Sequence, residues 1–237
     1  MLNSQIIVPD IASHQKEPRD IQLIDYSRMY QAGARAVLFR ASCNMTVDLQ
    51  LKADFERAIK HELPVLHYHY LYWYNTPKEQ MKVYLDYVKS LGLTGAYELD
   101  YEEKLGKNPR SRVIQWLTES VKIIYGETGK YPTIYVSPGF WVPNRSYDPI
   151  INNCKLHLAH WGTVKPIIPL PWTDYQLLQF NVKKEGRLYG VQSDPIDLSI
   201  WNGSIESLYY YAGFEYKDPA SLSLEQRIDR LERIHTY

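Results

Sequence analysis

The stretch Ala96-Tyr97-Glu98-Leu99-Asp100-Tyr101-Glu102-Glu103 decides the fold, because an apolar strand changes here into a group of carboxylates. Side chains alternate between the faces of a strand, so Asp100 and Glu102 point to the same side, roughly 7 Å apart at ~3.3 Å per residue. Carboxylates at the end of a buried strand are costly to keep ionised unless they are paired or used. The stretch therefore predicts a buried strand that ends in an acidic site. A strand end that runs into an exposed acidic loop is the alternative.

Two carboxylates that lie close together push each other's pKa values apart, so that one can act as an acid while the other stays charged. These are the two roles that glycosidic bond cleavage requires. Asp100 and Glu102 are therefore a candidate pair for that chemistry.

Short apolar strands alternate with helical segments on both sides of this stretch. We expect strands near residues 5–8, 36–41, 64–70, 95–101, 132–136, 156–159, 175–180 and 189–191, and helices near residues 24–32, 48–61, 77–90 and 110–128. The repetition of strand and helix predicts a parallel sheet. The long helices stop after residue 138. The pattern favours an α/β fold, an irregular TIM-like (β/α) barrel of eight strands whose last three are poorly covered by helices, over an open sheet.

Composition excludes several classes of protein. The 27 Lys and Arg residues balance the 27 Asp and Glu residues, so no long-range field selects nucleic acid or an anionic membrane. No stretch approaches 18 apolar residues, which predicts no transmembrane helix. Cys43 and Cys154 are far apart, and we expect neither a metal nor a cofactor.

The chain is expected to form a catalytic barrel over residues 1–213 and a tail over residues 214–237. Leu224, Ile228, Leu231 and Ile234 lie on one stripe of a short amphipathic helix in this tail. The stripe is too short to predict a coiled coil, so we expect a helix that docks on the barrel or a linker to another partner. The default expectation is a monomer.

Further carboxylates lie where catalytic groups of such barrels are found. Asp10 follows the first strand and Asp197 belongs to the closing strand. In barrels of this type the catalytic groups lie at the carboxyl ends of strands, so these acids would converge with Asp100 and Glu102 if the sheet closes. Each acid alone could instead cap a turn or anchor a loop.

Read in order, these segments resemble the lysozymes of glycoside hydrolase family 25, which cleave the β-1,4 bond between N-acetylmuramic acid and N-acetylglucosamine in peptidoglycan. The resemblance covers about residues 5 to 205 and is carried by Pro9-Asp10-Ile11-Ala12-Ser13-His14, Tyr68-His69-Tyr70, Leu99-Asp100-Tyr101-Glu102, Ile134-Tyr135-Val136-Ser137, Leu158-Ala159-His160-Trp161, Gln179-Phe180 near Trp172, and Ile196-Asp197-Leu198 with Asn202-Gly203. The chain departs from the family where Gln15 replaces a Trp and where Ala41-Ser42-Cys43-Asn44 replaces an Ala-Thr-Glu-Gly element. Neither change falls on a catalytic acid of the family.

The resemblance implies a role for each acid. Glu102 would be the general acid, and Asp100 would stay ionised and polarise the N-acetyl group or stabilise the oxocarbenium-like charge, with retention of configuration. Asp10 and Asp197 would hold the substrate and tune the other two. A substrate-assisted route and a direct carboxylate nucleophile both remain open.

Candidate substrate-binding residues are the aromatic residues Tyr68, Tyr135 and Trp161, together with His69 and Gln179. Aromatic faces stack on pyranose rings while their polar ends form hydrogen bonds. The alternative for each aromatic residue is ordinary core packing.

Two rival functions remain open. A chitinase-like glycosidase is one, although its longer Asp-x-x-Asp-x-Asp-x-Glu run is missing here. A cell-wall glycan-binding or virion structural barrel without activity is the other. The N-terminus shows no secretory signal, so we expect a phage-encoded enzyme that is released by lysis or carried in the virion and acts on bacterial cell-wall peptidoglycan.

Overall fold

The computed structural model describes residues 5–12, 24–162, 165–192 and 195–235. Eight strands of one sheet close into a barrel, in the order β1 (Ile6–Ile11), β2 (Val37–Cys43), β4 (Val65–Tyr70), β5 (Tyr97–Asp100), β6 (Thr133–Val136), β7 (Lys155–Ala159), β8 (Leu177–Lys184) and β9 (Ile196–Trp201). Pairing of β9 and of β2 with β1 completes the ring. The short strand β3 (Thr46–Val47) extends β2 as a hairpin. The barrel confirms the predicted fold class.

One strand runs against the other seven. Strands β1, β2 and β4 to β8 are parallel to their neighbours, whereas β9 is antiparallel to both β8 and β1. Strand β9 therefore begins at the end of the barrel where the parallel strands finish.

The expected strand at residues 189–191 is wrong. Gly186–Tyr189 form a short 3-10 helix, η3, and Gly190 follows with a φ of 72°. That left-handed conformation suits glycine and cannot continue a strand. The carbonyl of Gly190 instead accepts a hydrogen bond from the Asp25 amide, and β9 supplies the eighth strand.

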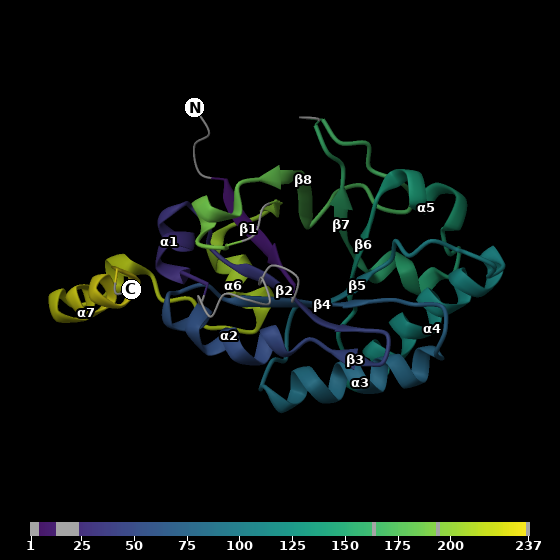
Figure 1. Ribbon diagram of the computed structural model, residues 1–237, viewed down its shortest axis with the longest axis horizontal. Coiled ribbons are helices and arrows are strands. Elements are labelled where there is room, and N and C mark those ends of the chain that lie inside the picture. The colour runs from purple at the N-terminus through teal and green to yellow at the C-terminus, as the bar shows by residue number, and fades with distance from the viewer. Residues whose placement is uncertain (1–4, 13–23, 163–164, 193–194, 236–237) are drawn as a thin grey trace.

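Four helices follow early strands along the chain, and Figure 1 shows them around the outside of the barrel. They are α1 (Tyr26–Gln31), α2 (Leu49–Lys60), α3 (Pro77–Ser90) and α4 (Arg110–Thr128), close to the predicted ranges. Thr76 and Glu79 form a reciprocal capping box at the start of α3. Gly129, with a φ of 70°, ends α4.

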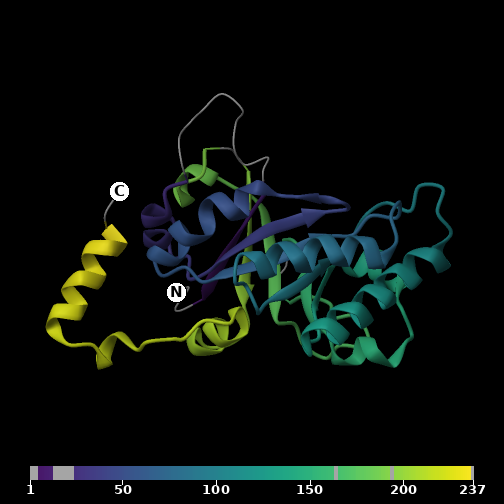
Figure 2. The same ribbon diagram turned by 90° about the horizontal axis from the view of Figure 1, so that it is seen from below.

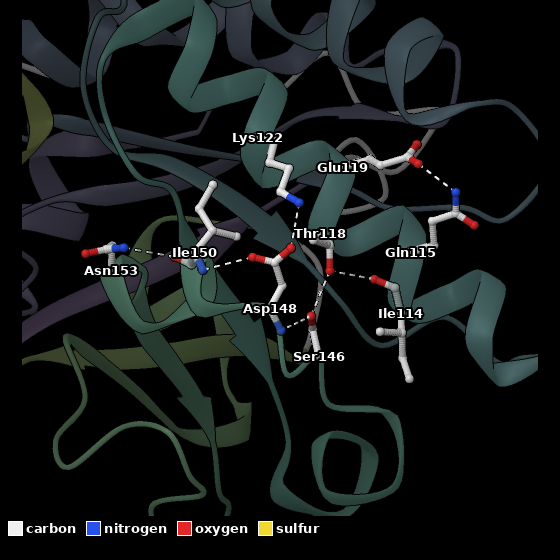
Figure 3. A network of polar contacts seen from close by, with 9 residues as sticks. All are labelled: Ile114, Gln115, Thr118, Glu119, Lys122, Ser146, Asp148, Ile150 and Asn153. Atoms are coloured by element: carbon white, nitrogen blue, oxygen red, sulfur yellow. Dashed lines mark hydrogen bonds and ion pairs between the residues drawn. The ribbon is translucent and has the colours of Figure 1, made fainter.

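After β6 the covering elements are short, as expected. Helix α5 (Pro138–Asn144) and the 3-10 helix η2 (Pro149–Asn153) take the place of a long helix. The segment between them is tied to α4 through two contacts, an ion pair of Lys122 with Asp148 and a hydroxyl contact of Thr118 with Ser146 (Figure 3).

Helix α6 (Ile205–Ala212) closes the amino-terminal end of the barrel. Leu208 and Ala212 are buried against inward-facing residues of the strands, including Val8 and Leu66. A side chain at Gly95 would lie 2.5 Å from the Tyr211 carbonyl oxygen, so only glycine permits this approach. The opposite end of the barrel is therefore the end that can admit a ligand.

The tail carries a short 3-10 helix, η4 (Pro219–Ser221), and the predicted helix α7 (Leu224–His235). Helix α7 lies beyond α1, on the side of the molecule away from α4 and α5 (Figures 1 and 2). Its last turn docks, because Ile234 is buried and its carbonyl accepts a hydrogen bond from the Ser27 hydroxyl. Arg230 also forms an ion pair with Glu62.

The expected apolar stripe of the tail is thus only partly covered. Leu224, Ile228 and Leu231 are exposed while Ile234 is buried. No helix in the described ranges has the length and apolarity needed to cross a membrane.

Candidate active site

A cavity of about 160 Å³ opens at the end of the barrel opposite α6. All four predicted carboxylates line it, together with three of the predicted substrate-binding residues. Its lining residues are Asp10, Ala12, Arg40, Tyr68, Tyr70, Glu98, Asp100, Glu102, Tyr135, Gln179 and Asp197. The acids that are far apart in the sequence therefore meet in one place.

Strand direction explains how these acids converge. Asp100 is the last residue of β5, and Glu102, two positions beyond the end of the strand, lines the same cavity. Asp10 lies within β1, one residue before its end, and is directly paired with Asp197 of β9.

The position of Asp197 corrects one detail of the prediction. We expected each acid at the carboxyl end of a strand, but Asp197 is the second residue of β9. It reaches the same cavity because β9 runs antiparallel to its neighbours.

Asp10 and Asp100 occupy an environment that disfavours negative charge. Burial raises the pKa of Asp10 well above its ordinary value, and the charges of Asp197 and Glu98 add to the effect. Burial likewise raises the pKa of Asp100 strongly, with further contributions from Glu102 and Asp10. Within the described part of the chain, the Oδ1 atoms of Asp10 and Asp100 have no hydrogen-bond partner.

Glu102 and Asp197 are less enclosed than Asp10 and Asp100. Burial raises the pKa of Glu102, and the neighbouring charges of Asp197 and Glu103 raise it further. Burial also raises the pKa of Asp197. The four carboxyls therefore retain protons at pH values where isolated carboxyls are ionised.

Arg40 is the cation that faces this group of acids. Its charge lowers the pKa of both Asp10 and Asp100, against the larger effect of burial. Asp48, the residue that caps α2, holds the guanidinium through an ion pair of 3.0 Å. Sequence reasoning missed Arg40, although its position on β2 shares the inward parity of Leu38.

Polar and aromatic side chains form one wall of the site. The Tyr135 hydroxyl and the Trp161 indole each donate a hydrogen bond of 2.9 Å to Oε1 of Gln179. Tyr135 and Gln179 line the cavity, whereas Trp161 lies beside it with 52% of its surface exposed. Tyr68 is buried in the cavity wall.

His69 does not reach the cavity, and its predicted contact with substrate is wrong. It is fully buried on the outer face of β4, where Nδ1 contacts the Ser42 hydroxyl at 2.8 Å and Nε2 contacts Oε1 of Gln80 at 3.1 Å. Burial lowers the pKa of its imidazole to about 4. The alternation of side chains along a strand places Tyr68 and Tyr70 inward and His69 outward, a signal that was present in the sequence.

The floor of the cavity is a buried polar network that sequence reasoning did not assign to the site. Glu98 contacts Nδ1 of His157 at 3.0 Å, and Nε2 of His157 contacts the Ser199 hydroxyl at 2.8 Å. These side chains lie below the four carboxylates and connect β5, β7 and β9. Among the described residues, no group of three or more His, Cys, Asp and Glu side chains has an arrangement that could hold a metal ion. Ser13 and His14 of the opening motif lie outside the described residues.

Solved structures share this fold. A muramidase from Trichobolus zukalii superposes with a TM-score of 0.71 at 23% identity, covering 87% of this chain and 98% of that one. A bacterial lysozyme from Streptomyces coelicolor gives 0.74 at 20% identity, covering 89% and 98%. The catalytic domain of an endolysin from a bacteriophage of Listeria monocytogenes gives 0.66 at 22% identity, covering 87% and 97%. Among curated proteins none matches the sequence.

The family model described as glycosyl hydrolases family 25 matches residues 9–188. This range includes Asp10, Asp100 and Glu102 but ends before Asp197, which the antiparallel pairing of β9 with β1 brings to the same cavity. Since the match spans well over half of the sequence, the chain belongs to glycosyl hydrolases family 25.

Proposed function

We propose that this family 25 glycoside hydrolase is a muramidase, which cleaves the β-1,4 bond between N-acetylmuramic acid and N-acetylglucosamine in bacterial peptidoglycan. The observation that carries the proposal is the cavity in which Asp10, Asp100, Glu102 and Asp197 meet at the open end of the barrel. The muramidase, lysozyme and endolysin descriptions of the structural relatives support the choice of substrate.

Glu102 is the general acid of the proposed reaction, which donates its proton to the oxygen of the leaving sugar. That role needs a carboxyl that remains protonated above its ordinary titration range. The raised pKa of Glu102 and its place in the lining of the cavity support the assignment.

Asp100 is the ionised partner in the same reaction and polarises the acetamido group of the substrate, with retention of configuration at the cleaved centre. Arg40 is the group that favours the ionised form of Asp100, because its charge lowers the pKa of that carboxyl against the larger effects of burial and the neighbouring acids, and it is not among the influences on Glu102. The two neighbouring acids thus have different electrostatic surroundings, as an acid and a charged partner require.

Asp10 and Asp197 hold the substrate and raise the pKa values of the other two acids. Their direct pairing across β1 and β9 fixes them as a unit opposite Asp100. Tyr68, Tyr135 and Gln179 form the walls against which a sugar packs, with Trp161 at the rim.

A barrel that binds wall glycans without cleaving them is less favoured. Glu102 and Asp100 would then carry an electrostatic cost without use, since buried like charges destabilise the fold. A chitinase-like activity has no separate observation in its support.

The biological setting is a separate part of the proposal. We propose a phage-encoded enzyme that reaches the wall at lysis or with the virion, on the strength of the endolysin relatives. We further propose that it acts as a monomer without binding nucleic acid or membrane, because one chain supplies all four acids and its formal net charge is zero.

The test is turbidity loss of purified cell walls by the wild-type protein and by Glu102→Gln, followed by analysis of the new reducing ends. We expect the wild type to expose N-acetylmuramic acid ends and Glu102→Gln to lose roughly 10²–10⁴-fold in rate, the contribution typical of a general acid. Glu119→Gln, on a half-buried residue of α4 outside the cavity, is the matched control and should retain full activity. Wall binding without hydrolysis by the wild type would replace the proposal with the non-catalytic alternative.

A further inference from the structure

Three tyrosines form a continuous row that leads away from the cavity along the connection from β4 to α3. Tyr70 lines the cavity, and its ring centroid lies 5.4 Å from that of Tyr72. The rings of Tyr72 and Tyr74 are stacked, with centroids 5.5 Å apart and an angle of 23° between their planes. Tyr74, the outermost of the three, is 75% exposed. We call Tyr70, Tyr72 and Tyr74 the tyrosine row.

The alternation of side chains shows that the row is not part of the core. Leu71 and Trp73, which lie between the tyrosines in the sequence, are buried at 0% and 2% exposure. They account for the packing of this segment against the barrel. On the other side the row leaves Tyr70 and Tyr72 half-buried and presents the Tyr74 ring to solvent, where apolar surface has no folding benefit.

Hydrogen bonds from α3 hold the segment in a fixed conformation. The Gln80 amide accepts from the backbone N–H of Tyr72 at 3.1 Å and donates to the carbonyls of Tyr72 and Asn75 at 2.8 and 2.7 Å. His69 contacts the same Gln80 oxygen at 3.1 Å. The Trp116 indole of α4 donates a further hydrogen bond to the Asn75 carbonyl. The rings are thus preorganised rather than attached to a loose loop.

The same segment is bonded to the strand that carries the acids. The backbone N–H of Leu71 donates to the carbonyl of Asp100 at 3.1 Å, and the Trp73 indole donates to the carbonyl of Glu103 at 3.1 Å. The Tyr70 hydroxyl donates to the Glu103 carboxylate at 3.0 Å. The row is therefore held in register with Asp100 and Glu102.

We propose that the tyrosine row is an additional saccharide-binding platform, which takes sugar units of the glycan chain beyond those enclosed by the cavity. This inference rests on the proposed function. Aromatic rings with a polar hydroxyl suit pyranose rings, which present apolar C–H faces and hydroxyl edges. Continuity with the cavity through Tyr70 selects a glycan chain as the occupant, because a polymer that enters the cavity must continue beyond it. The platform makes the enzyme prefer long strands over short ones.

The test compares short and long glycans in variants of the exposed end of the row. Peptide-free peptidoglycan strands are separated into tetrasaccharides and strands of about ten sugars or more, and binding to Glu102→Gln protein is measured by calorimetry. Adding Tyr74→Ala should weaken binding of long strands by about 3–10-fold, the loss that one aromatic contact produces, and leave tetrasaccharide binding unchanged. Tyr74→Phe, which keeps the ring, should restore long-strand binding.

The matched control is Tyr210→Ala. Tyr210 is 87% exposed but belongs to α6, which closes the opposite end of the barrel, so its removal should change nothing. Equal binding of long strands by Tyr74→Ala and its parent would overturn the inference. An effect confined to strands that still carry peptides would also overturn it, since the occupant would then be the peptide.

The outcomes separate the two proposals. If the wild-type protein cleaves walls but Tyr74→Ala weakens the binding of short and long strands equally or not at all, the proposed function stands and the platform is rejected. Wild-type protein that neither cleaves walls nor binds strands of any length rejects both. Because Tyr74 is exposed, its replacement should not disturb folding, and unchanged tetrasaccharide hydrolysis in a Tyr74→Ala protein that retains Glu102 confirms this.

Discussion

Asp100 has an environment that opposes its own ionisation. Its carboxyl is buried, Oδ1 has no hydrogen-bond partner in the described part of the chain, and Glu102, Asp10 and Glu98 all add negative charge nearby. Such a site is retained at a cost in stability when it serves a reaction. At the residue scale, replacing such an acid should therefore raise the free energy of unfolding and lower the activity.

The first prediction concerns stability. Asp100→Asn should raise the free energy of unfolding at pH 7 by about 1–3 kcal/mol, or roughly 2–4 °C in Tm for each kcal/mol, while abolishing wall hydrolysis. The folded state holds the Asp100 proton more tightly than the unfolded state, so wild-type stability falls as pH rises from about 4 through the raised pKa. Below about pH 4 the carboxyl is neutral in both states, and the gain should vanish.

Thermal denaturation at pH 3.5 and pH 7 measures this difference. Asp86→Asn is the control, because Asp86 is exposed on α3 and its replacement should change Tm little at either pH. An Asp100→Asn protein that is less stable than wild type at pH 7 would contradict the prediction.

The second prediction concerns the pH profile of hydrolysis. Activity should fall at high pH as the pair of Asp100 and Glu102 loses its remaining proton, and fall at low pH as the pair gains a second one, both at pH values above the ordinary range of a carboxyl. Arg40→Gln removes the charge that lowers the pKa of Asp10 and Asp100, so the acidic limb should move to higher pH. The alkaline limb should move less, because Arg40 is not among the direct influences on Glu102. Profiles of kcat/KM against pH for the wild type and Arg40→Gln test this prediction. A shift of the alkaline limb alone would refute the roles given to the two acids.

At the scale of elements, the connection from β4 to α3 shows how a helix can shape a binding surface. The capping box of Thr76 and Glu79 fixes the start of α3, and one turn later Gln80 bonds back to the segment that precedes the helix. Gln80 is fully buried and links the backbone of this segment to His69 of β4. The local sequence predicted the cap, but the role of Gln80 depends on the packing of α3 against β4.

The third prediction tests this link. Gln80→Leu leaves several buried polar groups without partners and should lower the free energy of unfolding by about 1–3 kcal/mol. Long glycan strands should also bind more weakly, because the tyrosine row loses its support. Gln115→Leu is the control: Gln115 is exposed on α4 and its amide donates a hydrogen bond to the nearby Glu119 on the surface, so the change should stay within about 0.5 kcal/mol. Urea unfolding measures the free energy of unfolding. A Gln80→Leu protein with the same free energy of unfolding as the wild type would exclude the proposed support.

At the scale of the whole molecule, the acids and the tail belong to different parts of the fold. The acids lie at the open end of the barrel, whereas α7 docks at its side through Ile234, Ser27 and the pair of Arg230 with Glu62. A larger groove of about 840 Å³ lies between α7 and the barrel, lined by α2 and the segment after α6, and none of the four acids lines it. We therefore propose residues 1–213 as the catalytic unit and the tail as an accessory segment.

The fourth prediction is that a chain ending at Gly213 keeps its wall-hydrolysing activity. It should lose about 2–3 kcal/mol of stability, since it gives up one buried isoleucine and one partly exposed ion pair. Activity on walls and a pull-down with walls measure the outcome beside the full chain. A truncated protein that stays folded but no longer binds walls would make the tail a wall-binding element.

The sequence by itself determined the helices with their caps, the alternation of strand and helix, and the pairing of Asp100 with Glu102 on one side of a strand. These features depend on neighbours in the chain, where periodicity and capping act. The tertiary structure decided the rest. It reversed β9 so that Asp197 enters the site from the start of a strand, packed Gln80 of α3 against His69, and placed the tyrosine row beside the acids. Strand direction, register and helix packing bring together residues that are distant in the sequence, so no local pattern could fix them.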